Sequence, residues 1–344
     1  MLDYRDLHCW DSEHRALPAH FEQTMTAGKD GIAIVVDDRG AVYPITVDPV
    51  ATTPSTLLIG AAASAEFGIA VSTAGDLNGD GRSDVVVGAW LSTMNGFNAS
   101  GAAYVYYGSN NGISTSPSVT LTVAQNGAQF GCSVSTAGDV NGDGYSDLLI
   151  GSRTWESNTV TELSEGAVFV YYGSATGIGT TPNLTLQTDH ADDNFGSNVA
   201  CAGDINNDGF SDVLVGAYLS SYPTLNEGAV FVYLGSAGGL NPVAQHRLER
   251  NQGGAFFGRS VAGAGDVNGD GFSDVIIGSS KFIYTVGLND QGSAFVYYGS
   301  ALGLGAGLNP APGLQLYGTG NSTAYFGWWV SSAGDLNGDG YSDV

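Results

Sequence analysis

The chain is poor in cysteine and in basic residues, and each shortage argues against particular kinds of site or partner. Its three cysteines, Cys9, Cys132 and Cys201, form neither a Cys-x-x-Cys pair nor an even set, so neither a zinc site nor a disulfide framework is predicted. Ten lysines and arginines stand against 34 aspartates and glutamates, which gives a formal net charge of −24. Such a chain repels phosphate backbones and anionic lipids, so nucleic acid is not an expected partner.

Long apolar runs and a secretion signal are also missing. The apolar stretch 57–71 contains Glu66 and several glycines and is too short to span a bilayer, so no direct membrane insertion is expected. The first ten residues lack a basic start followed by an apolar stretch, so we expect no signal peptide in this chain.

What the chain has in abundance is glycine, 52 residues, and one repeated acidic motif. The pattern D-x-N-x-D-G-x-x-D occurs at 76–84, 139–147, 204–212, 266–274 and 335–343. A Phe-Gly pair begins nine residues ahead of each copy, at Phe67, Phe130, Phe195, Phe257 and Phe326. Copies recur every 62–69 residues, which is too long for a solenoid coil and suits a four-stranded blade.

Four strands can be placed in each period. Strand A is the Phe-Gly segment, strand B follows the acidic motif, and strand D is a short piece such as Leu184–Gln187. Strand C is rich in β-branched and aromatic residues, at 101–108, 166–173, 228–235 and 292–299. Since each sheet has two faces to cover, the sequence predicts an all-β fold, a β-propeller of four-stranded antiparallel blades. Blades are predicted to start at 67, 130, 195 and 257, with an incomplete one at 326.

The two ends of the chain do not fit this pattern. Residues 55–66 resemble a strand D without the rest of its blade, and 1–54 form a separate N-terminal segment with a β-hairpin predicted at 31–49, turning at Asp38-Arg39-Gly40. That segment is either an outer closing element or the tail of a preceding domain. Val344 directly follows the last acidic motif, where earlier copies begin an apolar strand, so we expect the chain to be a fragment.

The acidic motif has the composition of a calcium loop. Side-chain oxygens at positions 1, 3, 5 and 9 and the backbone carbonyl of position 7 can converge on one ion, and glycine at position 6 permits the sharp turn. Several charged oxygen ligands, with no His or Cys among them, select Ca²⁺ over transition metals. We therefore expect about five calcium sites. The predicted ligands are Asp76, Asn78, Asp80, Arg82, Asp84, Asp139, Asn141, Asp143, Tyr145, Asp147, Asp204, Asn206, Asp208, Phe210, Asp212, Asp266, Asn268, Asp270, Phe272, Asp274, Asp335, Asn337, Asp339, Tyr341 and Asp343.

The motif has two alternative interpretations. An EF-hand loop begins in the same way but carries a carboxylate at position 12, where this chain has Val87, Ile150, Val215 and Ile277. The loops could also be hairpin turns rich in Asp and Asn that bind no metal. Five copies with unchanged ligand types favour the calcium interpretation.

Together, the Phe-Gly pair, the acidic loop and the Gly-Ala after strand B resemble FG-GAP repeats, the blades of the integrin α-subunit propeller. The resemblance covers about residues 55–344. It implies a seven-bladed, calcium-stabilised propeller that works in extracellular adhesion or ligand binding. The Pro of Gly-Ala-Pro is replaced here, as in VGAW and IGSR, which favours a bacterial secreted or surface protein over a eukaryotic integrin.

A recognition surface is predicted on the face opposite the acidic loops. Antiparallel strand order places every A–B loop at one end of its blade and every B–C loop at the other. The B–C loops vary in length and are aromatic, which is typical of recognition surfaces for a protein or glycan ligand, although such residues can also simply cover strand ends. The candidate ligand-binding residues are Trp90, Trp155, Tyr218, Tyr222, Phe282 and Tyr284.

An enzyme is not predicted. The chain has no Gly-x-Ser-x-Gly elbow, no recurring His beside an acid, and only five histidines. Two hypotheses remain: an extracellular, secreted or cell-surface binding module, and a structural propeller attached to a catalytic hydrolase or lyase domain elsewhere in the full-length protein.

Overall fold

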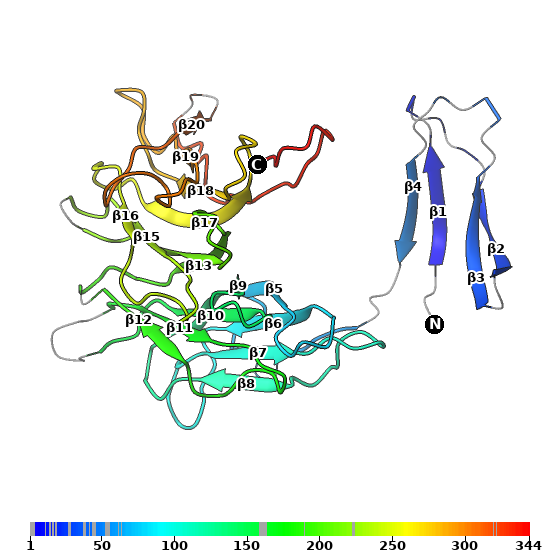
Figure 1. Cartoon of the computed structure of the whole chain (residues 1–344), viewed down its shortest axis with the longest axis horizontal. Coiled ribbons are helices and arrows are strands. Elements are labelled where there is room, and N and C mark those ends of the chain that lie inside the picture. Colours follow the sequence, from blue (N-terminus) through cyan, green and yellow to red (C-terminus); the bar gives the residue numbers. More distant parts are fainter. Residues whose placement is uncertain are drawn as a thin grey trace. The chain divides into compact units, whose positions relative to one another are not determined.

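The protein is described by a computed structural model, which covers the chain except residues 1–3, 11, 14, 16, 18, 27–28, 37–38, 41, 43–45, 52–55, 61, 63, 158–163, 189, 222–223, 319 and 321. It forms two compact units, Met1–Leu57 and Leu58–Val344. All of the regular structure that Figure 1 draws is β-strand, and no helix long and apolar enough to cross a membrane occurs in the described ranges.

The first unit contains β1 (Tyr4–Trp10), β2 (Ala19–Thr26), β3 (Lys29–Val36) and β4 (Thr46–Ala51). Strand β2 pairs with β3, and β1 pairs with β4. The predicted hairpin over 31–49 is therefore wrong, although Asp38 of its predicted turn lies outside the described residues. The pairing of Thr26 with Lys29 leaves two residues between β2 and β3, and such a short connection closes more cheaply than the nine residues that separate β3 from β4.

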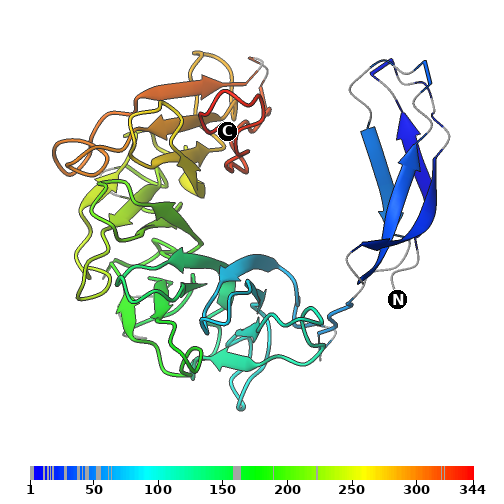
Figure 2. The same ribbon diagram turned by 45° about the vertical axis from the view of Figure 1, so that its right-hand side comes forward.

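The second unit contains four antiparallel sheets, each of four strands in sequence order. Figure 2 shows the sheets following one another along the chain. Their bounds are β5 (Ala70–Gly75), β6 (Asp84–Ala89), β7 (Ala102–Tyr106) and β8 (Val119–Thr122); β9 (Phe130–Gly138), β10 (Asp147–Ser152), β11 (Ala167–Tyr171) and β12 (Leu184–Leu186); β13 (Asn198–Gly203), β14 (Asp212–Ala217), β15 (Ala229–Tyr233) and β16 (His246–Leu248); β17 (Phe257–Gly265), β18 (Asp274–Ser279), β19 (Ser293–Tyr297) and β20 (Leu314–Tyr317). The predicted all-β fold of four-stranded blades is confirmed.

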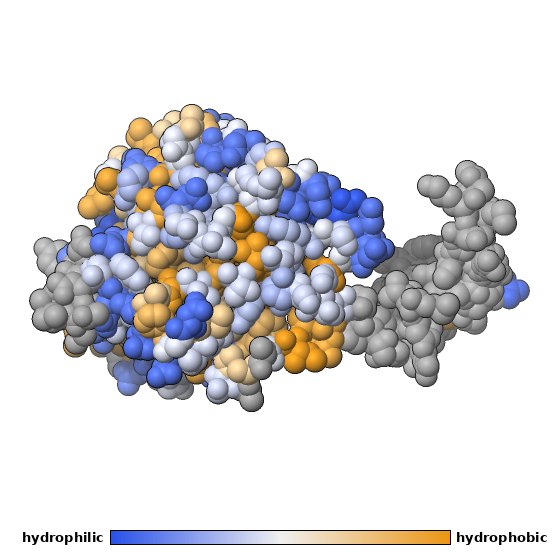
Figure 3. All heavy atoms as spheres, turned by 90° about the horizontal axis from the view of Figure 1, so that it is seen from below, coloured by the Kyte–Doolittle hydropathy of each residue, from blue (hydrophilic) through white to orange (hydrophobic). Residues whose placement is uncertain are grey.

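The blades stack face to face. The first core cluster joins Val105 and Leu121 of one sheet to Ile150 of the next. Phe130, from the Phe-Gly pair, is fully buried there and lies edge-on to Phe169, with ring centroids 5.3 Å apart. Phe195 and Phe257 are fully buried as well, so these three Phe-Gly pairs anchor their segments in the core, whereas Phe326 is 37% exposed. On the face that Figure 3 shows, apolar residues lie in small groups among polar ones.

Neither end of the second unit forms the strands that the sequence predicts. Residues 56–60 are not in a strand, Leu57 and Ile59 are exposed, and none of the strands in the described residues pairs with this segment. In the fifth repeat, only isolated bridges form, between Gly292 and Phe326 and between Gly334 and Asp343.

Candidate functional site

The acidic loops connect strands A and B, and neighbouring loops are tied to each other. Ser146, at position 8 of the second loop, donates its backbone N–H to the carbonyl of Asp76 in the first loop, at 2.9 Å. The same bond recurs from Ser211 to Asp139, from Ser273 to Asp204 and from Ser342 to Asp266, at 2.9–3.0 Å. The loops of successive repeats therefore lie side by side at one end of the blades.

Inside each loop, side-chain oxygens accept hydrogen bonds from the loop's own backbone. In the second loop, Asp139 Oδ1 accepts from the N–H of Asp143 at 3.1 Å, and Oδ2 accepts from Gly144 at 2.8 Å. Asn141 Oδ1 also accepts from Asp143, at 2.9 Å. Gly144, at position 6, has φ +88°, a left-handed conformation that favours glycine. The sharp turn expected at position 6 is present.

The aspartate at position 9 is different, because it is fully buried. Asp147 Oδ2 accepts from the N–H of Val140 at 2.9 Å, and Oδ1 accepts from Gly173, after strand C, at 2.9 Å. It therefore ties its loop to the end of strand C. Asp84, Asp212 and Asp274 are equally buried and make the same two bonds.

Burial sets the electrostatics of these position-9 carboxyls. Desolvation, together with a smaller effect of the negative charges at positions 1 and 5 of the same loop, raises the pKa of Asp147 and of Asp212 to about 7. The pKa values of Asp84 and Asp274 are raised for the same reasons. Each of these loops thus holds a buried carboxyl whose ionised form would be stabilised by a nearby positive charge.

These residues fit a hard divalent cation by donor type. In the part of the chain that the structure describes, no three His, Cys, Asp or Glu side chains form a metal-ligating cluster, and the loop carboxylates instead accept N–H groups of their own loop. The oxygen-only ligand set and the three neighbouring carboxylates of each loop both suit Ca²⁺.

The side chain at position 7 couples neighbouring loops, a role that was not predicted from the sequence. A Cβ added to Gly79, at position 4, would lie 2.5 Å from the ring of Tyr145 in the next loop. Gly142 stands in the same relation to Phe210, and Gly269 to Tyr341. The available signal was an aromatic residue at position 7 in four of five copies.

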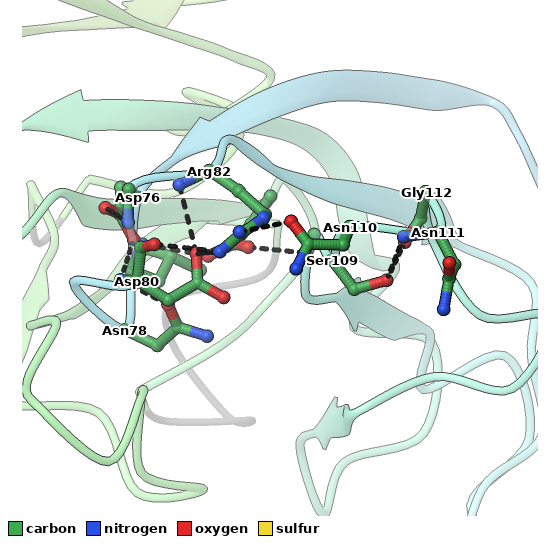
Figure 4. Close-up of polar contacts among 12 residues, drawn as sticks. Asp76, Asn78, Asp80, Arg82, Ser109, Asn110, Asn111 and Gly112 are labelled. Atoms are coloured by element: carbon green, nitrogen blue, oxygen red, sulfur yellow. Dashed lines mark hydrogen bonds and ion pairs between the residues drawn. The ribbon is translucent and has the colours of Figure 1, made fainter. Parts of the chain in front are cut away.

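The first loop has Arg82 at position 7 instead. Figure 4 shows its side chain reaching from the acidic loop toward the connection after β7. Its Nη1 donates to the carbonyl of Asp80 at 2.9 Å, and its Nη2 donates to Asn110 Oδ1. A cation thus contacts this loop, whereas the others carry aromatic side chains at this position.

Three of the six candidate ligand-binding residues pack into the fold. Trp155 lies edge-on to Phe169, with centroids 6.0 Å apart, and Phe282 contacts Phe295 at 5.2 Å. The Tyr284 hydroxyl donates to the Gly318 carbonyl at 3.0 Å. These contacts favour the alternative that such aromatics cover strand ends. Tyr222 lies outside the described residues.

The other two, Trp90 and Tyr218, line one cavity of about 220 Å³. Arg153, Arg259 and Trp328 line it with them, and we call these five residues the aromatic cup. Its members follow a strand B or occupy the third position of a Phe-Gly segment. They therefore lie at the end of the blades opposite the acidic loops. Arg259 and Trp328 were not predicted because they lie in Phe-Gly segments rather than in B–C loops.

The repeats belong to a known family. Residues 76–150 match the FG-GAP-like repeat, and residues 130–171, 195–233 and 257–297 match the FG-GAP repeat. The chain is an FG-GAP repeat protein.

Within that class, the chain is integrin α-like. It is 33% identical to integrin alpha-5 of Xenopus laevis over 62% of this chain, 34% identical to integrin alpha-V of Gallus gallus over 60%, and 39% identical to integrin alpha-4 of Xenopus laevis over 44%. The matched regions span 20%, 19% and 14% of those integrins' own lengths. The expectation of a bacterial source stays a prediction.

Proposed function

We propose that residues 58–344 form a calcium-stabilised, extracellular propeller module that binds a protein or glycan ligand and catalyses no reaction. The observation that carries this proposal is the row of five acidic loops, in which successive loops are hydrogen-bonded to each other and the first four hold a fully buried position-9 aspartate. The similarity to integrin α subunits supports a binding role over the alternative of a scaffold for a catalytic domain.

Calcium would be held by the side-chain oxygens at positions 1, 3, 5 and 9 and by the position-7 carbonyl, as in Asp139, Asn141, Asp143, Tyr145 and Asp147. The ion supplies positive charge to three carboxylates that otherwise repel each other. The chain's own residues connect each loop to its surroundings. The position-9 aspartate ties the loop to strand C, and the position-8 serine ties it to the preceding loop.

An extracellular location follows from the expected affinity. Exposed loops of this composition resemble extracellular calcium modules, with dissociation constants on the order of 10⁻⁴ to 10⁻³ M, which cytosolic calcium would leave empty. Localisation of the parent protein to the cytoplasm, or a submicromolar dissociation constant, would contradict this part of the proposal.

Equilibrium dialysis against millimolar calcium tests the loop assignment. The wild-type protein should bind about five ions, one for each loop, and Asp143→Asn should bind about one fewer because it removes a charged ligand without changing side-chain size. Asp192→Asn makes the same charge change at an exposed residue between strands D and A, outside the loops, and should bind as many ions as wild type. Equal losses in both variants would contradict the assignment.

A further inference from the structure

The aromatic cup collects positive charge on a strongly acidic protein. Arg153 and Arg259 are two of only ten basic residues in a chain of net charge −24. The Arg153 guanidinium lies 4.1 Å from the centroid of the Trp90 ring, and that of Arg259 lies 3.9 Å from the Trp328 ring and 5.3 Å from Tyr218. Both cations are therefore stacked on the aromatic walls of one cavity.

Stacking leaves the in-plane N–H donors of an arginine available. Arg153 Nε donates to Gln129 Oε1 at 2.6 Å, but the hydrogen bonds of the described residues include no acceptor for its terminal nitrogens. Arg259 has no side-chain hydrogen bond within the same described set. A guanidinium held over aromatic rings, with its terminal N–H donors not bonded within the described residues, is arranged to bind a planar, bidentate anion.

We propose that the aromatic cup binds the carboxylate of an aspartate or glutamate side chain from a partner protein, with Arg259 as the main ligand and Arg153 as a second cation. This inference rests on the proposed function, because it names the ligand class for the face opposite the acidic loops. It predicts that the partner presents an acidic residue on a protruding loop.

Two features favour a side chain over an acidic sugar. The cavity of about 220 Å³ is smaller than the roughly 300–1,000 Å³ typical of small-molecule sites, so it suits one short side chain. In addition, the guanidinium groups already cover faces of Trp90 and Trp328, and a pyranose ring would need such faces for stacking. Trp329 also lines the cavity and is 74% exposed, which provides an aromatic rim for the partner's neighbouring residues.

Tryptophan fluorescence gives a direct test, since three of the five tryptophans line the cavity. The whole chain, in millimolar calcium and at fixed ionic strength, is titrated with the capped peptide acetyl-Gly-Asp-Gly-amide and, in parallel, with its Asn counterpart. We expect a saturable change with the Asp peptide and at least tenfold weaker binding of the Asn peptide, because only the carboxylate forms charge-assisted bonds with the arginines.

Three variants test the residues. Arg259→Gln and Arg153→Gln should each weaken binding of the Asp peptide, Arg259→Gln by about tenfold or more, the usual effect of losing a hydrogen bond to a charged group. Arg15→Gln makes the same charge change in the first unit and should bind like wild type. Melting temperatures show which variants are folded, and either cup variant alone suffices for the test.

Equal binding of the Asp and Asn peptides, no saturable binding, or unchanged affinity in both folded cup variants would overturn the inference. Binding of glucuronate without binding of the Asp peptide would overturn it as well, by showing that a sugar is the ligand. The proposed calcium role is tested separately. If the peptide binds but chelation does not change the melting temperature, the aromatic cup is supported as a carboxylate site and the calcium assignment is contradicted.

Discussion

Burial separates aspartates of the same motif into two kinds. Asp147 is fully buried and bonded to two elements of its blade, whereas Asp143 is at the loop surface and accepts a hydrogen bond from the nearby Tyr145 N–H. The sequence gives both residues the same letter. Only the three-dimensional structure shows that position 9 holds the blade together while positions 1, 3 and 5 shape the loop.

A buried histidine gives the molecule a pH-dependent contact. His246 is 1% exposed; its Nδ1 lies 2.9 Å from the Gly307 carbonyl and its Nε2 accepts from Leu304 N–H at 3.1 Å. Only the neutral ring can donate at one nitrogen and accept at the other. Burial lowers the pKa of His246 below its ordinary value of about 6.5.

The sign of the pH effect follows from that shift. Because the folded pKa is lowered, the stabilisation is fully present above about pH 6.5 and is lost as the pH falls below that value. Between pH 7.5 and pH 5, we expect the melting temperature of wild type to fall by about 2–4 °C more than that of His246→Leu. This difference corresponds to the loss of roughly one buried hydrogen bond. The other blades carry Val119, Leu184 and Leu314 at this position, so the variant has a precedent within the chain. If the melting temperatures of wild type and His246→Leu changed with pH in the same way, His246 would not be the pH-dependent contact.

Two tryptophans separate packing from surface exposure. Trp155 contacts Phe169 and the first core cluster, so Trp155→Ala should destabilise the protein by about 2 kcal/mol. Trp329 is 74% exposed, and Trp329→Ala should change the free energy of unfolding by no more than about 0.5 kcal/mol. Denaturant unfolding measures both. A neutral Trp155→Ala would return Trp155 to the set of recognition candidates.

Between elements, the contact of each acidic loop with the next is the distinctive feature. Gly142 has φ +73°, and a Cβ there would lie 2.7 Å from the ring of Phe210 in the following loop. In the third loop the same position is Asn207, with φ +56°, one of the few non-glycine residues that adopts this conformation readily. Position 4 therefore requires a residue that tolerates a positive φ, and at Gly142 that residue must also be small.

A pair of glycine variants tests this coupling. Gly142→Ala and Gly144→Ala both place alanine at positive φ, but no atom lies within 4 Å of a Cβ at Gly144. Both should lose about 1–2 kcal/mol from backbone strain, and Gly142→Ala should lose about 1 kcal/mol more because Phe210 must move. Adding Phe210→Leu should recover part of that extra loss. Equal destabilisation by the two alanines would show that the loops do not couple through this contact.

The elements also show what the sequence could predict. Strands B and C were placed well because each is a short β-branched run next to a repeated motif, as in Asp147–Ser152. The hairpin at 31–49 failed because pairing depends on which partner is nearest in space, and β4 pairs with the distant β1. Trp90 and Tyr218 of the aromatic cup were candidates from the sequence, but Arg259 and Trp328 were not, because residues of different repeats meet only when the blades stack.

At the scale of the whole molecule, charge is concentrated rather than spread. Fifteen of the 34 acidic residues lie in the five acidic motifs, and these motifs adjoin each other at one end of the blades. Repulsion between them opposes the stacking that the core clusters favour. A bound divalent ion in each loop would offset two of its three carboxylate charges and so weaken that repulsion, and stability of the second unit should therefore depend on calcium more than on ionic strength.

The melting temperature of the whole chain, measured by calorimetry with and without calcium, tests this account most directly. Each occupied site stabilises the folded state by roughly 2.7 kcal/mol at a free calcium concentration one hundred times its dissociation constant. We predict that the transition of the second unit rises by many degrees in 10 mM calcium relative to excess chelator. Sodium chloride at equal ionic strength should leave it nearly unchanged. A transition that calcium and chelator leave at the same temperature would contradict the claim that these loops are calcium sites.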